Sequence, residues 1–290
     1  MRYYQLAAEG AVRRLVVDDG DGVYDLTSTH PGLTGFRDLA GAASLAGEPV
    51  DDIARRRLAG AEQLPRGDLA SDLLCPVRAD EVWAAGVTYE ISEKAREQES
   101  SMAEIYMNVY DAERPEIFFK ATPSRTVGPG EAVGVRGDSD WNAPEPELAV
   151  VLHHGEIVGY TVGNDVSSRD IEGENPLYLP QAKIYDRCCS VGPCVVSPAS
   201  VGDPADLVMS MEILRDGETV FSDSTSTARM VRSPEELATY YRDHNSVPET
   251  AVLMTGTGLV PPEEFSLTAG DEVRIDIENV GTLVNPVVSV

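Results

Sequence analysis

EPELAVVLHHGEIVGYTVGND, residues 145–165, consists of two apolar segments on either side of a polar turn. Short apolar segments bounded by turn residues predict β-strands, and this order predicts a hairpin. Side chains alternate between the two faces of a strand, so Glu145 and Glu147 point to the same side. If the hairpin closes with an odd-numbered loop near Gly155, Asp165 lies opposite Glu145 on that face.

Three carboxylates would then lie close together at one end of the hairpin. They repel one another unless a cation lies between them. Hard oxygen ligands favour Mg²⁺, with Mn²⁺ or Ca²⁺ as substitutes, over zinc. The spacing alone fits an exposed acidic edge equally well, because the whole chain is acidic. A metal site formed by Glu145, Glu147 and Asp165 is one of two interpretations at this point.

The same region resembles a known protein family. Four elements occur in the order that is typical of the fumarylacetoacetate hydrolase family: EPELAVV (145–151), GYTVGNDVSSRD (159–170), Lys183 and Gly192-Pro193. The resemblance extends from about Val82 to the C-terminus. It implies a divalent metal ion held by two Glu and one Asp, and these positions match Glu145, Glu147 and Asp165.

Further segments resemble the branch of that family that acts on sugar acids. They are RPEIFFK (114–120), APEPE (143–147) and NPLYLPQAKIY (175–185). That branch contains 2-keto-3-deoxy-pentonate dehydratases. Many hydrolases of the family carry a His after the strand at 82–87, whereas residues 88–92 here read TYEIS. The resemblance therefore implies a dehydratase that converts a 2-keto-3-deoxy-pentonate, of the xylonate or arabinonate type, to 2,5-dioxopentanoate.

The implied reaction assigns chemical roles to two residues. A metal-bound 2-keto acid would lose its C3 proton and then its C4 hydroxyl group. Glu116 is our prediction for the acid or base that moves these protons, with a surface ion pair as the structural alternative. Lys183 is predicted to bind the carboxylate or the enolate oxygen as a cation, with a Schiff base as the chemical alternative.

Lysine is scarce in this sequence, with three Lys beside 20 Arg. Arg replaces Lys on a surface, but not where a compact ammonium group is needed. Lys120 and Lys183 lie in or beside the motifs above, so we predict that both contact the substrate. Arg169 and Thr257 are predicted as further substrate contacts. Chance retention of the lysines, a structural ion pair of Arg169 and a glycine-rich strand end around Thr257 are the alternatives.

The chain is strongly acidic, with a net charge of −26 and a pI near 4.4. This charge argues against nucleic acid and anionic membranes as partners. The resemblance implies a small anionic 2-keto acid as the ligand. We find no apolar run of 18 residues and no signal peptide at the start of the chain. An acidic, lysine-poor surface is typical of proteins from a salt-filled cytoplasm, where salt screens the repulsion. We therefore expect a cytoplasmic, halophile-like protein.

The length allows one large domain, or one large and one small domain, and the hydrophobic content supports a buried core. Residues 1–75 indicate a small N-terminal α/β domain, with strands at 3–7, 12–17 and 23–26 and helices at 36–45 and 50–64. Residues 76–290 form the predicted catalytic domain. Its many short strands, together with the resemblance, predict an α+β fold with a mixed β-sandwich or β-roll. A charged helix at 91–111 is predicted either as a mobile lid or as a solvated face.

Two other classes of function remain open. An acylpyruvate hydrolase or an oxaloacetate decarboxylase would use the same metal platform, with a His or an ordered water beside the metal. A catalytically silent metal-binding or interaction protein would lose metal, but no turnover, on Glu145→Gln substitution. The resemblance also implies self-association as a homodimer or a homotetramer.

Overall fold

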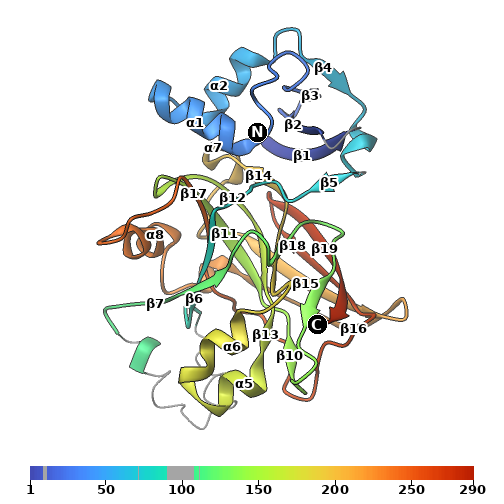
Figure 1. The fold of residues 1–290 in the computed structure, drawn as a ribbon, viewed down its shortest axis with the longest axis vertical. Coiled ribbons are helices and arrows are strands. Elements are labelled where there is room, and N and C mark those ends of the chain that lie inside the picture. The colour runs from blue at the N-terminus through green and yellow to red at the C-terminus, as the bar shows by residue number, and fades with distance from the viewer. Residues whose placement is uncertain (9–11, 71, 90–107, 111) are drawn as a thin grey trace.

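The computed structural model describes residues 1–8, 12–70, 72–89, 108–110 and 112–290. Figure 1 shows a small upper part, with helices α1 (Phe36–Ala46) and α2 (Val50–Arg57) on one side, above a larger part built mainly of strands. No helix in the described part of the chain is long and apolar enough to cross a membrane.

A mixed sheet of 12 strands runs through both parts. Ten strands follow one another in space in the order β4 (Glu62–Leu64), β3 (Val23–Asp25), β2 (Val12–Asp18), β1 (Arg2–Ala8), β14 (Cys189–Val196), β12 (Glu156–Asp165), β11 (Pro146–His153), β17 (Thr250–Met254), β6 (Glu81–Gly86) and β7 (Glu116–Ala121). Two short strands extend it, β5 (Leu73–Leu74) beside β1 and β8 (Thr126–Val127) beside β14. Most neighbours are antiparallel, but β17 with β6 and β14 with β8 are parallel.

A second sheet covers one face of the first. Its order is β16 (Glu218–Ser226), β15 (Val208–Arg215), β18 (Glu272–Ile277), β19 (Gly281–Ser289) and β9 (Val133–Val135). β10 (Asn142–Ala143) and β13 (Ser167–Ser168) form a separate pair. The short helices are α5 (Arg169–Glu174), α6 (Leu179–Lys183), α7 (Pro198–Val201) and α8 (Pro234–Arg242). The predicted α+β fold with a mixed two-sheet arrangement is confirmed.

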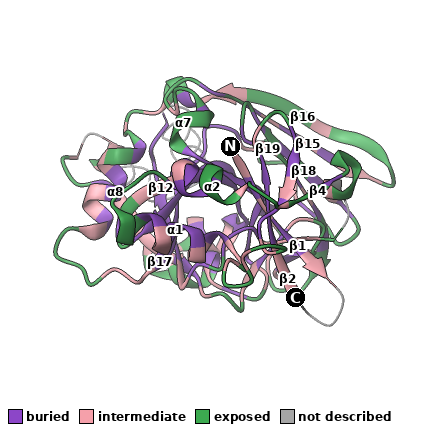
Figure 2. Cartoon of the chain, turned by 90° about the horizontal axis from the view of Figure 1, so that it is seen from above, coloured by how far each residue is buried: buried purple, intermediate pink, exposed green. Residues whose placement is uncertain are grey.

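Strand β11 lies at the centre of the core, and every one of its residues is buried. Leu148 and Val150 belong to a hydrophobic cluster shared with the second sheet. Ala149 and Val151 belong to another cluster, which includes Phe36 of α1. A strand that is covered on both faces has a continuous apolar sequence instead of an alternating one. By contrast, β16 is largely exposed, at the edge of its sheet (Figure 2).

The N-terminal strands and the first helix are where the sequence predicts them, as β1, β2, β3 and α1. The second half of the helix predicted at 50–64 is wrong. Helix α2 ends at Arg57, and residues 62–64 form β4. Gly60, with φ of +83°, turns the chain between them, a conformation that glycine adopts without steric cost.

The domain division at residue 75 stays a prediction. Hydrogen-bonded strand pairing crosses that division, because Arg2 pairs with Val196 and Tyr3 with Val195. The helix predicted at 91–111, and with it the question of a lid, lies almost entirely outside the described residues.

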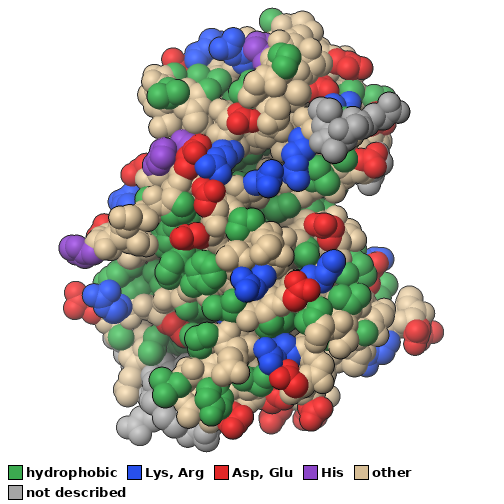
Figure 3. Space-filling model, viewed as in Figure 1, with side chains coloured by type: hydrophobic (Ala, Val, Ile, Leu, Met, Phe, Trp, Pro, Cys, Tyr) green, Lys and Arg blue, Asp and Glu red, His purple; other side chains and the backbone are tan. Residues whose placement is uncertain are grey.

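Charged side chains cover both parts of the molecule. On the face shown in Figure 3, Asp and Glu are spread over the upper and the lower part, with Arg among them. Some Arg side chains link the two parts. Arg37 of α1 lies 2.8 Å from Asp80 and 2.5 Å from Glu249 in ion pairs. Pairs this exposed contribute little to stability individually.

Candidate active site

The register of the β11–β12 hairpin determines which carboxylates meet. The loop has two residues, His154 and Gly155, both with positive φ (+49° and +81°), as in a type I′ turn. The predicted odd-numbered loop is therefore wrong. A bulge between Val151 and Leu152 adds one residue on β12 and shifts the pairing by one. Beyond this bulge the predicted pairing is recovered.

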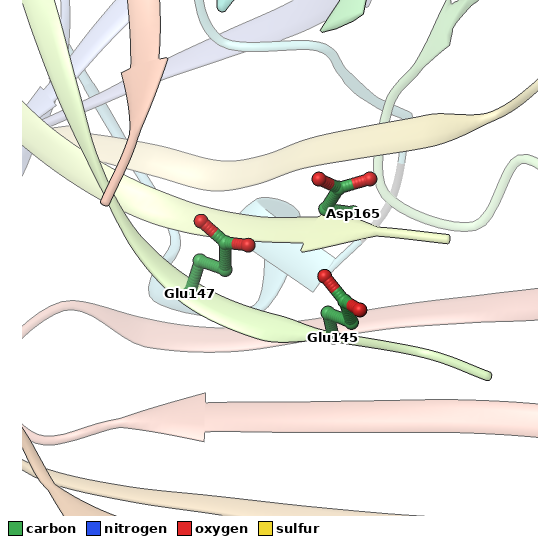
Figure 4. A group of neighbouring side chains, drawn as sticks. All are labelled: Glu145, Glu147 and Asp165. Atoms are coloured by element: carbon green, nitrogen blue, oxygen red, sulfur yellow. The ribbon is translucent and has the colours of Figure 1, made fainter. Parts of the chain in front are cut away.

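Glu145, Glu147 and Asp165 come together as the pattern predicts. The main-chain N–H of Asp165 donates to the main-chain oxygen of Glu145 at 3.0 Å, which brings the two residues opposite each other. One carboxylate oxygen from each of the three residues lies within 4.8 Å of the others, and all three side chains are buried. Figure 4 shows the three carboxylates turned toward a common space. The alternative of an exposed acidic edge is excluded.

Strand direction explains why the other site residues lie nearby. β11 and β7 begin at this end of the sheet, whereas β12, β17 and β6 end there. The residues at these strand ends therefore converge, although the sequence separates them widely. Helix α6 covers the same end and carries Lys183, and α5 begins with Arg169.

Two cations neutralise the carboxylate of Glu145 from different sides. Lys183 Nζ lies 2.8 Å from its Oε2, and Arg169 Nη2 lies 2.7 Å from its Oε1. Lys183 Nζ also lies 3.3 Å from Oδ2 of Asp165 and 2.6 Å from the hydroxyl of Ser167. Lys183 and Arg169, both predicted from the sequence, thus lie directly at the carboxylate cluster.

Lys120 lies on the other side of Asp165 and is fully buried. Its Nζ lies 2.5 Å from Oδ1 of Asp165 and donates to the main-chain oxygens of Val166 and Lys183, at 2.9 and 2.6 Å. The ammonium group thus forms one ion pair and two hydrogen bonds inside the protein. Its predicted contact with substrate stays a prediction.

A small cavity opens beside the cluster. Its apolar wall consists of Ala85, Gly86, Val87 and Phe118. Its polar wall consists of Glu145, Arg169, Lys183 and Thr257. Lys183 Nζ lies 5.5 Å from the centre of the Phe118 ring, so the ammonium group packs over an aromatic face. An anionic ligand in this cavity would meet two cations and one hydroxyl.

Glu116 reaches the edge of this cavity through the β6–β7 ladder. It pairs with Gly86, and its carboxylate lies so close to Gly86 that a Cβ there would overlap with Oε2 of Glu116. Phe118 shares the face of Glu116, whereas Phe119 packs edge-on against Trp83, with ring centres 5.6 Å apart. The face that carries Glu116 is therefore the one that faces the site.

Three contributions to the site escape the sequence analysis. The N–H of Gly256 donates to Oε2 of Glu147 at 2.5 Å, and the hydroxyl of Ser167 accepts from Lys183. Val87 has φ of +54°, which is a rare conformation for a β-branched residue. Strained backbone of this kind is concentrated at functional sites. The Gly256-Thr257-Gly258 sequence is a usable signal for the first, and Ser167 lies within the GYTVGNDVSSRD segment. Nothing in the sequence indicates the backbone conformation of Val87.

Burial and neighbouring charges shift the pKa values of Glu147 and Lys183. The pKa of Glu147 is well above its usual value because of burial and the negative charges of Asp165 and Glu145. Burial lowers the pKa of Lys183, but the charges of Asp165 and Glu145 outweigh burial and raise it overall. Lys183 therefore stays a charged ammonium at neutral pH, which disfavours the Schiff-base alternative.

The histidines lie away from the cavity. None of the residues that line it is a His. His153 and His154 are at the hairpin turn, at the far end of β11 from Glu147. His153 is buried and His154 is exposed. His-assisted hydrolysis has no candidate residue in this cavity.

Comparison with known proteins agrees with the geometry. The family described as fumarylacetoacetate (FAA) hydrolase C-terminal matches residues 81–288. The chain belongs to the fumarylacetoacetate hydrolase family. The family match begins with β6 and ends within β19, so it includes every strand that contributes to the site.

Within this family, the chain is similar to proteins and solved structures named as dehydratases of 2-keto-3-deoxy sugar acids. A protein named probable 2-keto-3-deoxyxylonate dehydratase, from Haloferax volcanii, is 59% identical over 290 residues and 100% of both chains. A 2-dehydro-3-deoxy-D-arabinonate dehydratase from Saccharolobus solfataricus is 48% identical over 73% of each chain. A structure titled 2-keto-3-deoxy-D-arabinonate dehydratase complexed with magnesium and 2,5-dioxopentanoate is 36% identical, with a TM-score of 0.85 over 100% of this chain and 99% of that one.

Proposed function

We propose that this protein is a Mg²⁺-dependent dehydratase that converts a 2-keto-3-deoxy-pentonate, of the xylonate or arabinonate type, to 2,5-dioxopentanoate. The observation that carries the proposal is the buried Glu145, Glu147 and Asp165 cluster beside Lys183, in a chain 59% identical to a probable dehydratase of this class. The structural neighbour with magnesium and 2,5-dioxopentanoate supports both the metal and the product.

The donor set fits magnesium. Three carboxylates supply only oxygen atoms, and Mg²⁺ prefers oxygen ligands. Glu145, Glu147 and Asp165 would hold the ion, and the same donors would accept Mn²⁺ or Ca²⁺ as substitutes. When bound, Mg²⁺ supplies Lewis-acid polarisation of the 2-keto group, which acidifies the proton on C3.

Residues of the chain itself would perform the proton transfers. Glu116, against Gly86 at the cavity edge, takes the C3 proton or delivers a proton to the departing C4 hydroxyl. Loss of the C3 proton and the C4 hydroxyl removes one water molecule and leaves a double bond between C3 and C4. Removal of a proton from C5 and addition of one at C3 then gives an enol between C4 and C5, which tautomerises to the aldehyde at C5. Lys183 stabilises negative charge on the substrate oxygens. Thr257 and Arg169, which line the same cavity, orient the carboxylate.

Two features of the cavity favour dehydration over hydrolysis. Its wall has no His to activate water, and Phe118, Val87 and Ala85 present apolar surface. An acylpyruvate hydrolase or an oxaloacetate decarboxylase would require an activated water or another proton donor at this wall. Oxaloacetate tautomerases, such as the mitochondrial protein Fahd2a of Rattus norvegicus, are more distant at 31% identity over 93% of this chain.

Turnover of single pentonates tests the proposal. 2-Keto-3-deoxy-xylonate and 2-keto-3-deoxy-arabinonate are supplied separately, in molar KCl with Mg²⁺, with and without a chelator. We expect 2,5-dioxopentanoate from at least one of them, and none with the chelator. Cleavage of an acylpyruvate or loss of CO₂ from oxaloacetate, with neither pentonate consumed, would contradict the proposal. If Glu145→Gln abolished metal binding but changed no turnover, a catalytically silent metal-binding protein would be favoured instead.

The cellular setting and assembly are parts of the same proposal. We infer a salt-rich cytoplasm from the net charge of −26 and from the relative in Haloferax volcanii. We also infer self-association as a homodimer or homotetramer. Light scattering after size-exclusion chromatography in molar KCl distinguishes these two masses, and a monomer of 31.2 kDa would contradict the inference.

A further inference from the structure

Lys120 has surroundings that differ from those of a substrate-binding lysine. It belongs to β7, its side chain is 0% exposed, and it does not line the cavity. In this chain 20 of the 23 basic residues are Arg. A lysine at a fully buried position in such a chain indicates that a compact ammonium group is needed there.

The ammonium group of Lys120 contacts three oxygen atoms. It forms an ion pair with Oδ1 of Asp165 at 2.5 Å and donates to the main-chain oxygens of Lys183 and Val166, at 2.6 and 2.9 Å. All three oxygens converge on a single nitrogen atom. A guanidinium group distributes its donors over a wider planar fork, so Arg at this position would not satisfy the same three oxygens.

These contacts tie Lys120 to two residues of the site. Asp165 is held from both sides, by Lys120 at Oδ1 and by Lys183 at Oδ2. Lys120 also holds the main chain of Lys183, whose ammonium group lies at the cavity. The hydroxyl of Tyr185 donates to the oxygen of Val166 at 3.0 Å, which fixes the chain after β12 at the same point.

We infer that Lys120 is a positioning residue that orients Asp165 toward the magnesium ion and Lys183 toward the substrate. The inference rests on the magnesium site of the proposed function. Lys120 acts through these two residues and has no contact with the substrate. Groups that hold a metal ligand in this way typically change metal affinity by about 10- to 100-fold when they are removed.

Two variants at this position test the inference. Lys120→Met keeps the length of the side chain and removes all three donors, whereas Lys120→Arg keeps the charge. We expect both variants to bind Mg²⁺ about 10- to 100-fold more weakly than the native protein, by calorimetry in molar KCl. We also expect a lower kcat at saturating Mg²⁺, because Lys183 is displaced.

A third variant controls for general loss of stability. Arg215 pairs with the buried Asp271 at 2.8 Å in the second sheet, so Arg215→Met also removes a cation from a buried carboxylate. We expect it to lower Tm and to leave Mg²⁺ affinity unchanged. The inference would be overturned if Lys120→Met bound Mg²⁺ with the affinity of the native protein. It would also be overturned if Lys120→Arg kept both the native Mg²⁺ affinity and the native kcat. Failure of both Lys120 variants to fold would overturn it too, since Lys120 would then be a requirement of folding.

The design separates this inference from the proposed function. If the native protein binds Mg²⁺ but consumes neither pentonate, the proposed reaction fails. The affinity comparison among the three variants would still decide whether Lys120 positions the metal ligands.

Discussion

The main-chain N–H of Gly256 donates to Oε2 of Glu147 across 2.5 Å. This bond links the segment after β17 to the start of β11 and orients the carboxylate of Glu147. Gly256 has φ of +90°, and a Cβ there would overlap with Oγ1 of Thr88 and lie 3.0 Å from the oxygen of Ala85. The close approach of Gly256 to the end of β6 and the residues after it therefore requires glycine.

Gly256→Ala is expected to weaken Mg²⁺ binding and to lower the free energy of unfolding by about 2–4 kcal/mol, from left-handed strain and steric overlap. Urea unfolding and calorimetry measure the two effects. Gly270→Ala is the matched control, because Gly270 has φ of +99° and open space around its Cα. It should show the strain alone and native Mg²⁺ affinity. Equal losses in both variants would contradict the role of the Gly256 contact.

Removal of the metal or of a ligand should abolish turnover. Glu145→Gln, Glu147→Gln and Asp165→Asn are each expected to lower kcat/KM by about 10³-fold or more, because the charge that holds Mg²⁺ is reduced. Glu218→Gln, at an exposed position of β16, is the control and should behave like the native protein. Turnover that survives both a chelator and these substitutions would place the reaction elsewhere.

Magnesium affinity should fall as the pH falls. The raised pKa of Glu147 means that the metal-free protein holds a proton there at a pH where an ordinary Glu is ionised. Mg²⁺ needs the ionised carboxylate, so binding releases this proton and affinity drops by up to about tenfold per pH unit below that pKa.

The same shift has the opposite effect on the metal-free fold. A raised folded-state pKa adds stability that is fully present below the unfolded-state pKa and is lost as the pH rises through the folded-state pKa. We therefore expect the increase in Tm produced by Mg²⁺ to be larger at pH 8 than at pH 5.5, by differential scanning calorimetry. Equal increases at both pH values would contradict the assignment to Glu147.

Glu116→Gln tests proton transfer separately from metal binding. We expect kcat to fall by about 10²- to 10⁴-fold, since a general acid or base contributes this much. Mg²⁺ affinity should stay native, because Glu116 is not part of the carboxylate cluster. Glu113→Gln, an exposed change three residues away, serves as the control. Native kcat in Glu116→Gln would transfer the acid–base role to another group.

Low salt should destabilise the protein. Acidic side chains cover both parts of the molecule (Figure 3), and the net charge is −26. Self-repulsion at this charge is screened only at high ionic strength, where the Debye length falls to about 3 Å at 1 M. We expect Tm to rise steadily between 0.1 and about 2 M KCl. Sucrose is the control for a general solvent effect, and a Tm independent of KCl would contradict the charge argument.

The carboxylate cluster is predicted only in part by the local sequence pattern. Period-two alternation places Glu145 and Glu147 on one face, and this part of the prediction needs no tertiary information. The partner Asp165 is predicted correctly for a partly wrong reason. The hairpin loop has two residues, and the bulge at Val151 and Leu152 restores the pairing. Bulges depend on packing against neighbouring strands, so the sequence does not reveal them.

Lys120 shows where residue type is informative and position is not. Lysine is scarce in this Arg-rich chain, which indicates that Lys120 is chemically important. The RPEIFFK segment that contains it places it near the site. Whether Lys120 faces the cavity or the protein interior, however, depends on how β7 packs against α6 and β12. Only the folded chain brings the main-chain oxygens of Val166 and Lys183 to its ammonium group. The end of α2 at Arg57 is a similar case, since pairing of β4 with β3 outweighs local helix propensity.

The sequence by itself determined the strand-rich fold, the common face of Glu145 and Glu147 and the acidic, lysine-poor surface, because alternation and charge are local properties that survive any packing. Only the tertiary structure decided which cation serves which carboxylate, that Lys120 lies behind Asp165, and that the N–H of Gly256 reaches Glu147. These contacts join residues from 18 to 109 positions apart, and they depend on strand order and direction, which the side-chain pattern of a single strand does not encode.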